Sequence, residues 1–374
     1  MTFRVGILGG GLQGVEACCL ARWAGWSTAL ADSRPQAPAS SLAGTFLNLN
    51  IDSLAGLDRA FSGCDLVVPA CEDGPTLELL SRWGRAAGNP PVAFDLEAYR
   101  VSSDKALSKE LFIRAGVPTP LAWPEAAYPL IAKPVSSSGS RGVNLLQNEA
   151  DFKRLFPGGD PTGWIVEQYC PGPSFSIEVT GRPGHYQAWL TTALEMDEVY
   201  DCRQVRAPAG LSPADDERFR EISLAAAEAL GLTGLMDVEV ILAPQGLKVL
   251  EIDARLPSQT PAVVYWSSGE NILVRLAENF CSPPAAAGPP VPGRAVIYEH
   301  VSVTPEGLTL PGEHIMAAAS PLALKENFHG ADWAVTDFAP GLSSWAATII
   351  IIDRDENSAL ARREDTLKRL GALK

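Results

Sequence analysis

The feature that most constrains this chain is a predicted hairpin whose two strands carry acidic residues on one face. Residues 234–242 alternate apolar and polar side chains, a Pro-Gln-Gly turn follows, and residues 247–255 repeat the alternation. Because successive side chains of a strand point to opposite faces, acids two positions apart share a face, as Asp237 and Glu239 do in the first run. The short turn makes the two runs antiparallel neighbours.

The second run carries Glu251, Asp253 and Arg255 at the same spacing. The hairpin should therefore gather these groups beside Glu239, and clustered carboxylates repel one another unless a positive partner joins them. Hard oxygen ligands suit Mg²⁺, which proteins commonly hold with one or two carboxylates together with phosphate oxygens. The alternative is a hairpin whose acidic face is solvated, since charged hairpin faces are common.

Length and charge narrow the class of protein. A chain of 374 residues exceeds one typical core, so we expect two or three domains. The net charge of −14 argues against nucleic acid or an anionic membrane surface as a partner, and no apolar run is long enough to span a bilayer. The seven cysteines are scattered without a CxxC pair, which disfavours a zinc site and suits the reducing cytoplasm, where we expect the protein.

The first segment has the pattern of a dinucleotide-binding domain. A buried strand at 3–8 leads directly into the glycines of 9–14, a helix follows, and a second strand ends at Asp32. This order matches the G-x-G-x-x-G fingerprint with an acid about twenty residues further on. One alternative is an NAD-dependent dehydrogenase, and another is a doubly wound domain that binds no dinucleotide.

Two acids follow a later strand of the same sheet. Residues 65–69 form an apolar run, and Glu72 and Asp73 come directly after it. Ligands bind at the carboxyl ends of strands in such sheets, so both acids are candidates for substrate binding. A role in capping the next helix is the equal alternative.

Lysines and a small-residue loop follow a boundary predicted at 85–91. Lys105 and Lys109 lie one turn apart on a predicted helix, and Lys133 ends a strand that runs into the Ser/Gly loop at 135–142. That loop is rich in backbone N–H and hydroxyl donors, which suits phosphates, although its spacing is not that of a classical P-loop. The alternatives are a mobile serine-rich hairpin loop and an ordinary surface lysine.

The order of these features resembles the ATP-grasp superfamily over most of residues 1–300. The resemblance implies an α/β and α+β fold, with a Rossmann-like domain at 1–88, an ATP-grasp domain at 89–290 whose lid lobe spans about 121–190, and a small β-rich portion at 291–374 that completes the ATP-grasp core. It also implies an ADP-forming carboxylate–amine ligase that uses ATP and two Mg²⁺ ions.

The resemblance assigns roles residue by residue. It implies that Arg255 acts beside the transferred phosphate. It implies Mg²⁺ ligands at Glu239, Glu251 and Asp253. It implies ATP contacts at Gly11, Asp32, Asn50, Ile51, Lys105, Lys133, Ser138, Gly139, Glu167, Gln168 and Tyr169.

Within the superfamily, the chain is most similar to the ligase family of pyrrolysine biosynthesis. That family joins 3-methyl-D-ornithine, or D-ornithine, through an acyl phosphate to the ε-amine of L-lysine. The similarity lies in the stretches 94–105, 200–202, 234–239, 247–261 and 297–300. It implies contacts to L-lysine at Leu12, Gln13, Glu72 and Asp73, and contacts to the ornithine at Asp201, Ser258, Gln259 and Glu299. We also expect a homodimer. The alternatives are an ATP-grasp ligase for another amino acid pair and a non-catalytic nucleotide sensor.

Overall fold

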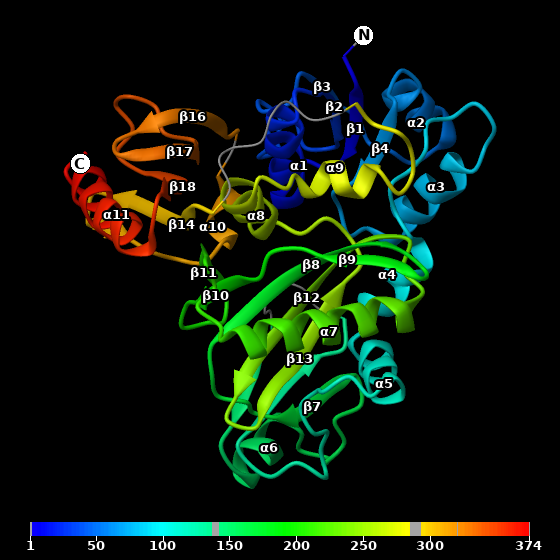
Figure 1. The fold of residues 1–374 in the computed structure, drawn as a ribbon, viewed down its shortest axis with the longest axis vertical. Helices are drawn as coiled ribbons and strands as arrows, with labels where there is room; N and C mark the ends of the chain where they lie inside the picture. Colours follow the sequence, from blue (N-terminus) through cyan, green and yellow to red (C-terminus); the bar gives the residue numbers. More distant parts are fainter. Residues whose placement is uncertain (1, 137–141, 285–292, 320, 374) are drawn as a thin grey trace.

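A computed structural model describes residues 2–136, 142–284, 293–319 and 321–373. The predicted ATP contacts at Ser138 and Gly139 lie outside these residues. The described chain forms a four-stranded sheet, a three-stranded sheet and an eleven-stranded sheet. Figure 1 shows the N-terminal unit and the C-terminal strands side by side at one end of the molecule, with the three-stranded sheet at the other end. None of the helices within these ranges has the length and apolarity needed to cross a membrane.

The N-terminal unit is a parallel sheet with helices, as predicted. Its strands lie in the order β3-β2-β1-β4, and every pairing is parallel. Apolar runs make the two inner strands almost wholly buried, which is typical of parallel sheets. The elements are β1 (Arg4–Leu8), α1 (Leu12–Trp23), β2 (Ser27–Asp32), β3 (Thr45–Asn48), α2 (Leu54–Phe61), β4 (Leu66–Pro69) and α3 (Gly74–Gly84).

The glycine turn between β1 and α1 has close contacts that leave no room for a Cβ atom on Gly9, Gly10 or Gly14. A Cβ atom on Gly14 would collide with the carbonyl oxygen of Gly9. The Asp32 carboxylate accepts a hydrogen bond from the Gly10 backbone nitrogen at 2.6 Å and also contacts Arg34. In this structure the acid of the fingerprint therefore holds the turn itself.

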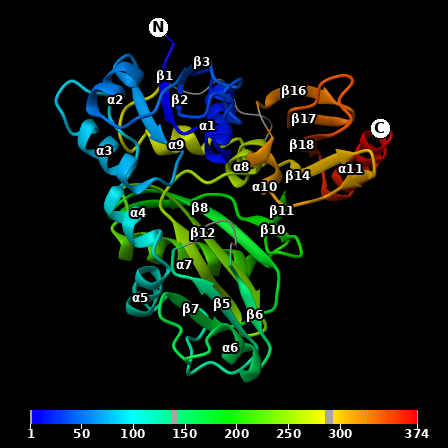
Figure 2. The ribbon, with the colours of Figure 1, turned by 180° about the vertical axis from the view of Figure 1, so that it is seen from behind.

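The three-stranded sheet is a small antiparallel lobe with its own aromatic core. Its order is β6-β5-β7, and the rings of Trp123, Phe152, Phe156 and Trp164 pack against one another beside it. Figure 2 shows this sheet and α6 at the end of the molecule away from both termini. The elements of this region are α4 (Leu96–Ser102), α5 (Lys105–Ala115), β5 (Leu130–Pro134), β6 (Asn144–Leu146), α6 (Glu149–Leu155) and β7 (Trp164–Gln168).

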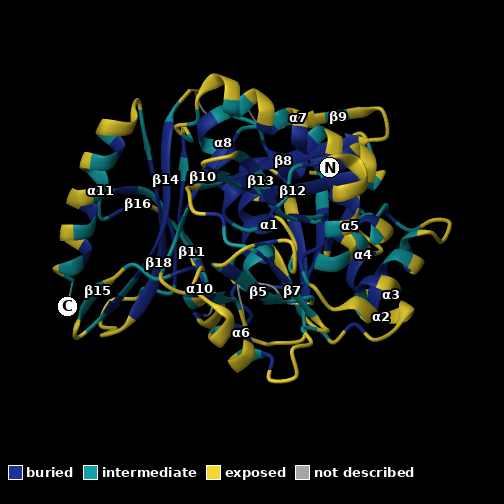
Figure 3. Cartoon of the chain, turned by 90° about the horizontal axis from the view of Figure 1, so that it is seen from below, coloured by how far each residue is buried: buried dark blue, intermediate teal, exposed yellow. Residues whose placement is uncertain are grey.

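The eleven-stranded sheet unites the centre of the chain with its C-terminal part. Its main path is β13-β12-β8-β10-β11-β14-β18-β17-β16, with β9 beside β8 and β15 beside β14. Figure 3 shows buried strands between helices whose outer faces are exposed. The strands are β8 (Ser174–Arg182), β9 (His185–Ala188), β10 (Thr192–Met196), β11 (Cys202–Ala207), β12 (Gly234–Ala243), β13 (Gly246–Asp253), β14 (Ala295–Thr304), β15 (Gly307–Thr309), β16 (Ala323–Phe328), β17 (Ala331–Thr336) and β18 (Trp345–Asp353). The helices are α7 (Pro213–Leu230), α8 (Thr260–Ser268), α9 (Ile272–Ala277), α10 (His314–Ala318) and α11 (Glu356–Gly371).

Strand pairing connects several of the predicted ranges. β8 lies inside the lid range predicted at 121–190 but belongs to the large sheet, and β14 continues that sheet by pairing with β11. The boundaries at 88 and 290 stay predictions.

Aromatic packing fixes the N-terminal unit to the rest of the chain. Trp23 in α1 stacks on Tyr265 in α8 with ring centroids 5.2 Å apart, and it also contacts Trp266 and Trp333. The Glu16 carboxylate accepts a hydrogen bond from the Ala262 backbone nitrogen at 2.6 Å, at the start of α8. Such contacts join α1 to the helix that follows the predicted acidic hairpin.

The close approach of Gly14 to the Gly9 carbonyl oxygen leads to a prediction about stability. Gly14→Ala should destabilise the protein by roughly 1–3 kcal/mol, because the added methyl group must push α1 away from the turn. Thermal unfolding would measure the loss. Gly63→Ala is the matched control, since nothing lies within 4 Å of a Cβ atom there. Equal melting temperatures for the two variants would contradict this account of the turn.

Candidate active site

A cleft of about 1040 Å³ lies where the small lobe meets the large sheet. Strands β5, β7, β10, β12 and β13 line it together with the loop after β13. The predicted site residues in its wall are Glu72, Lys105, Lys133, Glu167, Gln168, Tyr169, Asp201, Glu239, Glu251, Asp253, Arg255, Ser258 and Gln259.

The acidic residues of the predicted hairpin stand in two rows across the strands. Glu239 in β12 pairs in register with Glu251 in β13, within the predicted hairpin. One rung further along, Asp237 pairs with Asp253 on one side and with Glu178 in β8 on the other. Because paired residues on neighbouring strands point to the same face, five carboxylates share one face of the sheet, and all of them except Glu178 line the cleft.

Two cations reach into this wall. Lys105, the first residue of α5, lies 3.3 Å from Glu251. The Arg255 guanidinium lies 2.7 Å from Asp253 and 2.7 Å from Glu72, and so links the hairpin to the N-terminal unit. Burial raises the pKa of Asp253 to about 6 although Arg255 opposes the shift.

Glu239 has no ion pair among the described residues. Burial, followed by the charge of Glu251, raises the pKa of Glu239 well above its ordinary value. Asp253 also has a buried Oδ1 atom without a hydrogen-bond partner. This all-oxygen set with surplus negative charge fits Mg²⁺. The carboxylate oxygens of Glu239, Glu251 and Asp253, all of which are described residues, do not all lie within 4.8 Å of one another. The three acids therefore line one wall but do not converge on a single ion position in this structure.

Two lysines share one buried carboxylate on the opposite wall. Glu167 in β7 lies 2.9 Å from the Lys133 ammonium and 2.6 Å from the Lys109 ammonium. Burial raises the pKa of Glu167, but the two lysines outweigh it and hold the pKa below the ordinary value. The side chain of Glu167 is thus engaged within the protein.

A β-bulge brings the two walls together. The pairing of β12 with β13 shifts after Glu239, whose partner is Glu251, because the next residue pairs with Val249. Leu250 is the extra residue, and its carbonyl oxygen accepts a hydrogen bond from the Lys133 ammonium at 3.4 Å. Bulges commonly redirect backbone groups beside active sites in this way.

The far end of the acidic rows is fully buried. Both Glu178 oxygens lack a hydrogen-bond partner, and burial followed by the charge of Asp237 raises the pKa of Glu178 to about 8. Burial likewise raises the pKa of Asp237 to about 7, although the Ser176 hydroxyl donates to its carboxylate. These groups bind protons near neutral pH.

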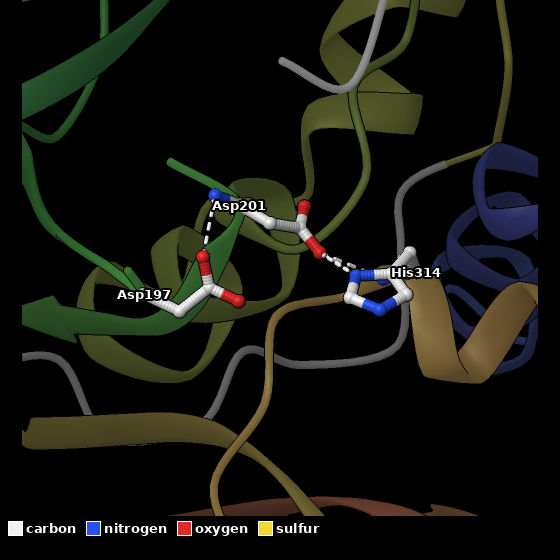
Figure 4. A group of neighbouring side chains, drawn as sticks. All are labelled: Asp197, Asp201 and His314. Atoms are coloured by element: carbon white, nitrogen blue, oxygen red, sulfur yellow. Dashed lines mark hydrogen bonds and ion pairs between the residues drawn. The ribbon is translucent and has the colours of Figure 1, made fainter. Parts of the chain in front are cut away.

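A second group of acids holds a C-terminal segment against the cleft. Asp201 accepts from the His314 backbone nitrogen at 3.1 Å and contacts the His314 ring, while Asp197 accepts from the Gly312 nitrogen at 3.2 Å. Figure 4 shows Asp197, Asp201 and His314 facing one another. Among the described residues they are the group that brings three potential metal ligands within 4.8 Å, but their hydrogen bonds to backbone groups indicate a structural tether. A Cβ atom on Gly312 would collide with the Asp201 carboxylate.

The loop after β13 is held by an acid that the sequence did not reveal. The Glu313 carboxylate accepts hydrogen bonds from Ser258 at 2.9 Å and from Gln259 at 2.6 Å. Gln259 has a positive φ of 72°, a strained conformation for a residue with a side chain. Burial raises the pKa of Glu313. The two predicted substrate residues are therefore oriented by this carboxylate.

Other predicted site residues do not line the cleft. Asp32 closes the glycine turn, and Asp73 caps α3 by accepting from the Thr76 nitrogen. Glu299 is fully buried and pairs with Arg363 at 2.6 Å and with Gln204 at 2.8 Å. The remaining predicted residues lie in the N-terminal unit. Gly11 precedes α1, and Asn50 and Ile51 follow β3. Leu12 lies beside Ser258 and Gln259, and the Gln13 amide lies 3.3 Å from the Glu72 carboxylate. Their roles stay predictions.

Sequence reasoning missed Lys109 and Glu313 as parts of the site. The spacing of Lys109 from Lys105 placed both on one helical face, and that signal could have marked Lys109. No local pattern marks Glu313, because its partners lie more than fifty residues away in the chain.

Comparison with known proteins agrees with this geometry. A family model described as an ATP-grasp domain matches residues 102–259. In fold, the chain is similar to the ADP complex of N5-carboxyaminoimidazole ribonucleotide synthetase, with a TM-score of 0.72 and 16% identity over 98% of this chain and 97% of that one. The chain is also similar to the biotin carboxylase domain of 2-oxoglutarate carboxylase from Hydrogenobacter thermophilus, which was solved as a dimer with MgADP. The TM-score is 0.72 and the sequence identity 16%, over 98% of this chain and 90% of that one.

The fold, the cleft and these matches define an ATP-grasp enzyme, an ATP-dependent carboxylate–amine ligase of the class that uses ATP and Mg²⁺. The predicted fold class is confirmed. Along its whole length the chain is 34% identical to the 3-methyl-D-ornithine–L-lysine ligase of Methanosarcina mazei, over 96% of this chain and 94% of that protein. The chain belongs to this ligase family. The dehydrogenase alternative accounted for the first domain alone and finds no support here.

The buried acid pair predicts a pH-dependent stability. The pKa of Glu178 is about 8 in the folded protein and about 4.5 in the unfolded chain, so the folded state keeps a proton that the unfolded state releases between these values. Its stabilising contribution is complete below about pH 4.5 and is lost as the pH rises through 8. Glu178→Gln mimics the neutral acid and should unfold at a higher temperature than the parent protein at pH 9, with no gain at pH 4.5.

Thermal unfolding at several pH values would test this. Glu217→Gln, an exposed position in α7, is the control and should follow the parent protein at each pH. A Glu178→Gln variant with the same pH slope as the parent would show that this carboxyl does not govern the dependence.

Proposed function

We propose that this protein joins the carboxylate of 3-methyl-D-ornithine, or of D-ornithine, to the ε-amine of L-lysine with hydrolysis of ATP to ADP and phosphate, as a step of pyrrolysine biosynthesis. The observation that carries the proposal is the presence of hairpin acids, Lys105 and Lys133 in one cleft, together with similarity over 96% of the chain to a ligase of that name. A ligase for another amino acid pair would keep the same nucleotide site.

The charges of the cleft suit the first half of this reaction. The ornithine carboxylate attacks the γ-phosphorus of ATP, the bond to ADP breaks, and an acyl phosphate forms. Catalysis of phosphoryl transfer is mainly positioning and charge stabilisation. In our proposal Lys105 and Lys133 hold the phosphates, and Arg255 stabilises the transferred group from its place between Asp253 and Glu72.

Glu239, Glu251 and Asp253 would hold Mg²⁺, with two ions in our proposal. When bound, the metal would supply positive charge that offsets the negative charge of the phosphates. The adenine would meet the backbone of 167–169, since the Glu167 carboxylate is engaged by lysines.

The second half forms the amide. The neutral lysine ε-amine attacks the carbonyl carbon of the acyl phosphate, a tetrahedral oxyanion forms, and phosphate leaves. Arg255 is placed to stabilise this oxyanion. Glu72, which adjoins both Arg255 and Gln13, supports a lysine site on the N-terminal side of the cleft.

The cleft also suits a cationic amino acid. Asp201 and Glu313 line it, and Glu313 has no ion pair among the described residues. We place the ornithine ammonium groups on this side. A homodimer and a cytoplasmic location stay predictions.

One reaction tests the proposed function directly. The protein with ATP, Mg²⁺, L-lysine and D-ornithine should release ADP and produce one amide, identified by mass spectrometry. Omitting either amino acid should stop amide formation. ADP release with a product from another amino acid pair would replace the substrates and keep the class, whereas no ADP release with any pair would contradict the proposal.

Arg255 offers a sharper prediction. Arg255→Lys should lower kcat by about 10²- to 10³-fold, because a lysine cannot span Asp253 and Glu72 and loses the fork geometry toward an oxyanion. Steady-state ADP release measures the change. Arg218→Lys, on the surface of α7, is the control and should leave kcat unchanged. A small effect at Arg255 would remove it from the catalytic machinery.

A further inference from the structure

Lys109 and Lys133 share the Glu167 carboxylate but differ in their access to the cleft. Lys133 and Glu167 line the cleft, whereas Lys109 is absent from its described wall. All three side chains are nearly buried, with exposed fractions of 12% for each lysine and 4% for Glu167. Lys109 therefore reaches the ligand only through the carboxylate that it shares with Lys133.

The charge of the group depends on Lys109. Glu167 offers one oxygen to each lysine, so the trio carries one net positive charge. With Lys109 neutral, the same carboxylate would cancel the charge of Lys133. A neutral Lys133–Glu167 pair would attract phosphate far less than an ammonium does.

The surroundings hold Lys109 in this place. Its ammonium donates to the Thr119 hydroxyl at 3.0 Å and to the Pro120 carbonyl oxygen, in the segment that leads from α5 into the small lobe. The Thr119 hydroxyl in turn donates to the Val249 carbonyl at 3.2 Å in β13. Burial lowers the pKa of Lys109, and Glu167 offsets part of that shift.

We propose that Lys109 is a positioning residue that neutralises Glu167 and thereby leaves Lys133 its positive charge for the phosphates of ATP. This inference rests on the proposed function, and it names a group outside the cleft that sets the affinity for nucleotide.

Four variants separate charge from packing. The net charge of the trio falls to zero in Lys109→Met, rises to two in Glu167→Gln, and returns to one in the double variant. Affinity for ATP with Mg²⁺, measured by calorimetry without amino acids, should rise with the net charge of the trio. Lys109→Met should bind most weakly, the double variant should bind as the parent protein does, and Glu167→Gln should bind at least as tightly. We expect Lys109→Met to weaken binding about tenfold, and the double variant and Lys109→Arg to bind within about threefold of the parent protein.

Lys153→Met is the control, since Lys153 lies exposed on α6 in the same lobe and pairs only with Glu149 among the described residues. It should bind ATP as the parent protein does. Where Lys109→Met fails to fold, Glu167→Gln and the double variant still decide the matter, because the first should bind no more weakly than the parent protein and the second should match it.

The outcomes distinguish the two proposals. A double variant that binds as weakly as Lys109→Met, or a Glu167→Gln variant weaker than the double one, would overturn the role of Lys109 while the ligase remains. A parent protein that binds no ATP would overturn the proposed function itself.

Discussion

Mutual repulsion among carboxylates is the constraint on which this structure depends. Strand register places Glu178, Asp237 and Asp253 in one row and Glu239 with Glu251 in the next, on a single face of the sheet. A chain selected for stability alone would not crowd acids in this way, because buried charges cost free energy unless they are paired. The fold tolerates the crowding through cations at one end of the rows and raised carboxyl pKa values at the other.

The cations come from parts of the chain that are distant in sequence. Lys105 stands at the start of α5, and Arg255 reaches across to Glu72 in the N-terminal unit. Lys133 extends from the small lobe to the Leu250 carbonyl at the bulge in the hairpin. Each wall of the cleft is thus held by a charge from another structural unit, and the same contacts that relieve repulsion also assemble the site.

Much of the site could be predicted because its central hairpin is local. Period-two alternation and a short turn were enough to predict two neighbouring antiparallel strands with acids on both, whereas the pairing of Glu239 with Glu251 depends on the bulge. The bulge at Leu250 could not be predicted, since it changes the pairing by one residue without a distinctive sequence. Glu299 shows the same limit over longer range, because its partner Arg363 comes from a helix sixty-four residues later. Asp32 matched a fingerprint for nucleotide binding, yet the fingerprint could not tell a ligand contact from the closure of a turn.

The aromatic seam between α1 and α8 has a consequence for anyone who divides this chain into modules. An excised fragment spanning 89–290 would lose Glu72 and Glu313 from the wall of the cleft. It would also lose the contacts of Trp23 with Tyr265 and Trp266, and the hydrogen bond of the Glu16 carboxylate to the backbone at the start of α8. That helix follows directly on the loop that carries Ser258 and Gln259. The position of this loop therefore depends on contacts from outside the fragment, with α1 through the start of α8 and with Glu313 directly.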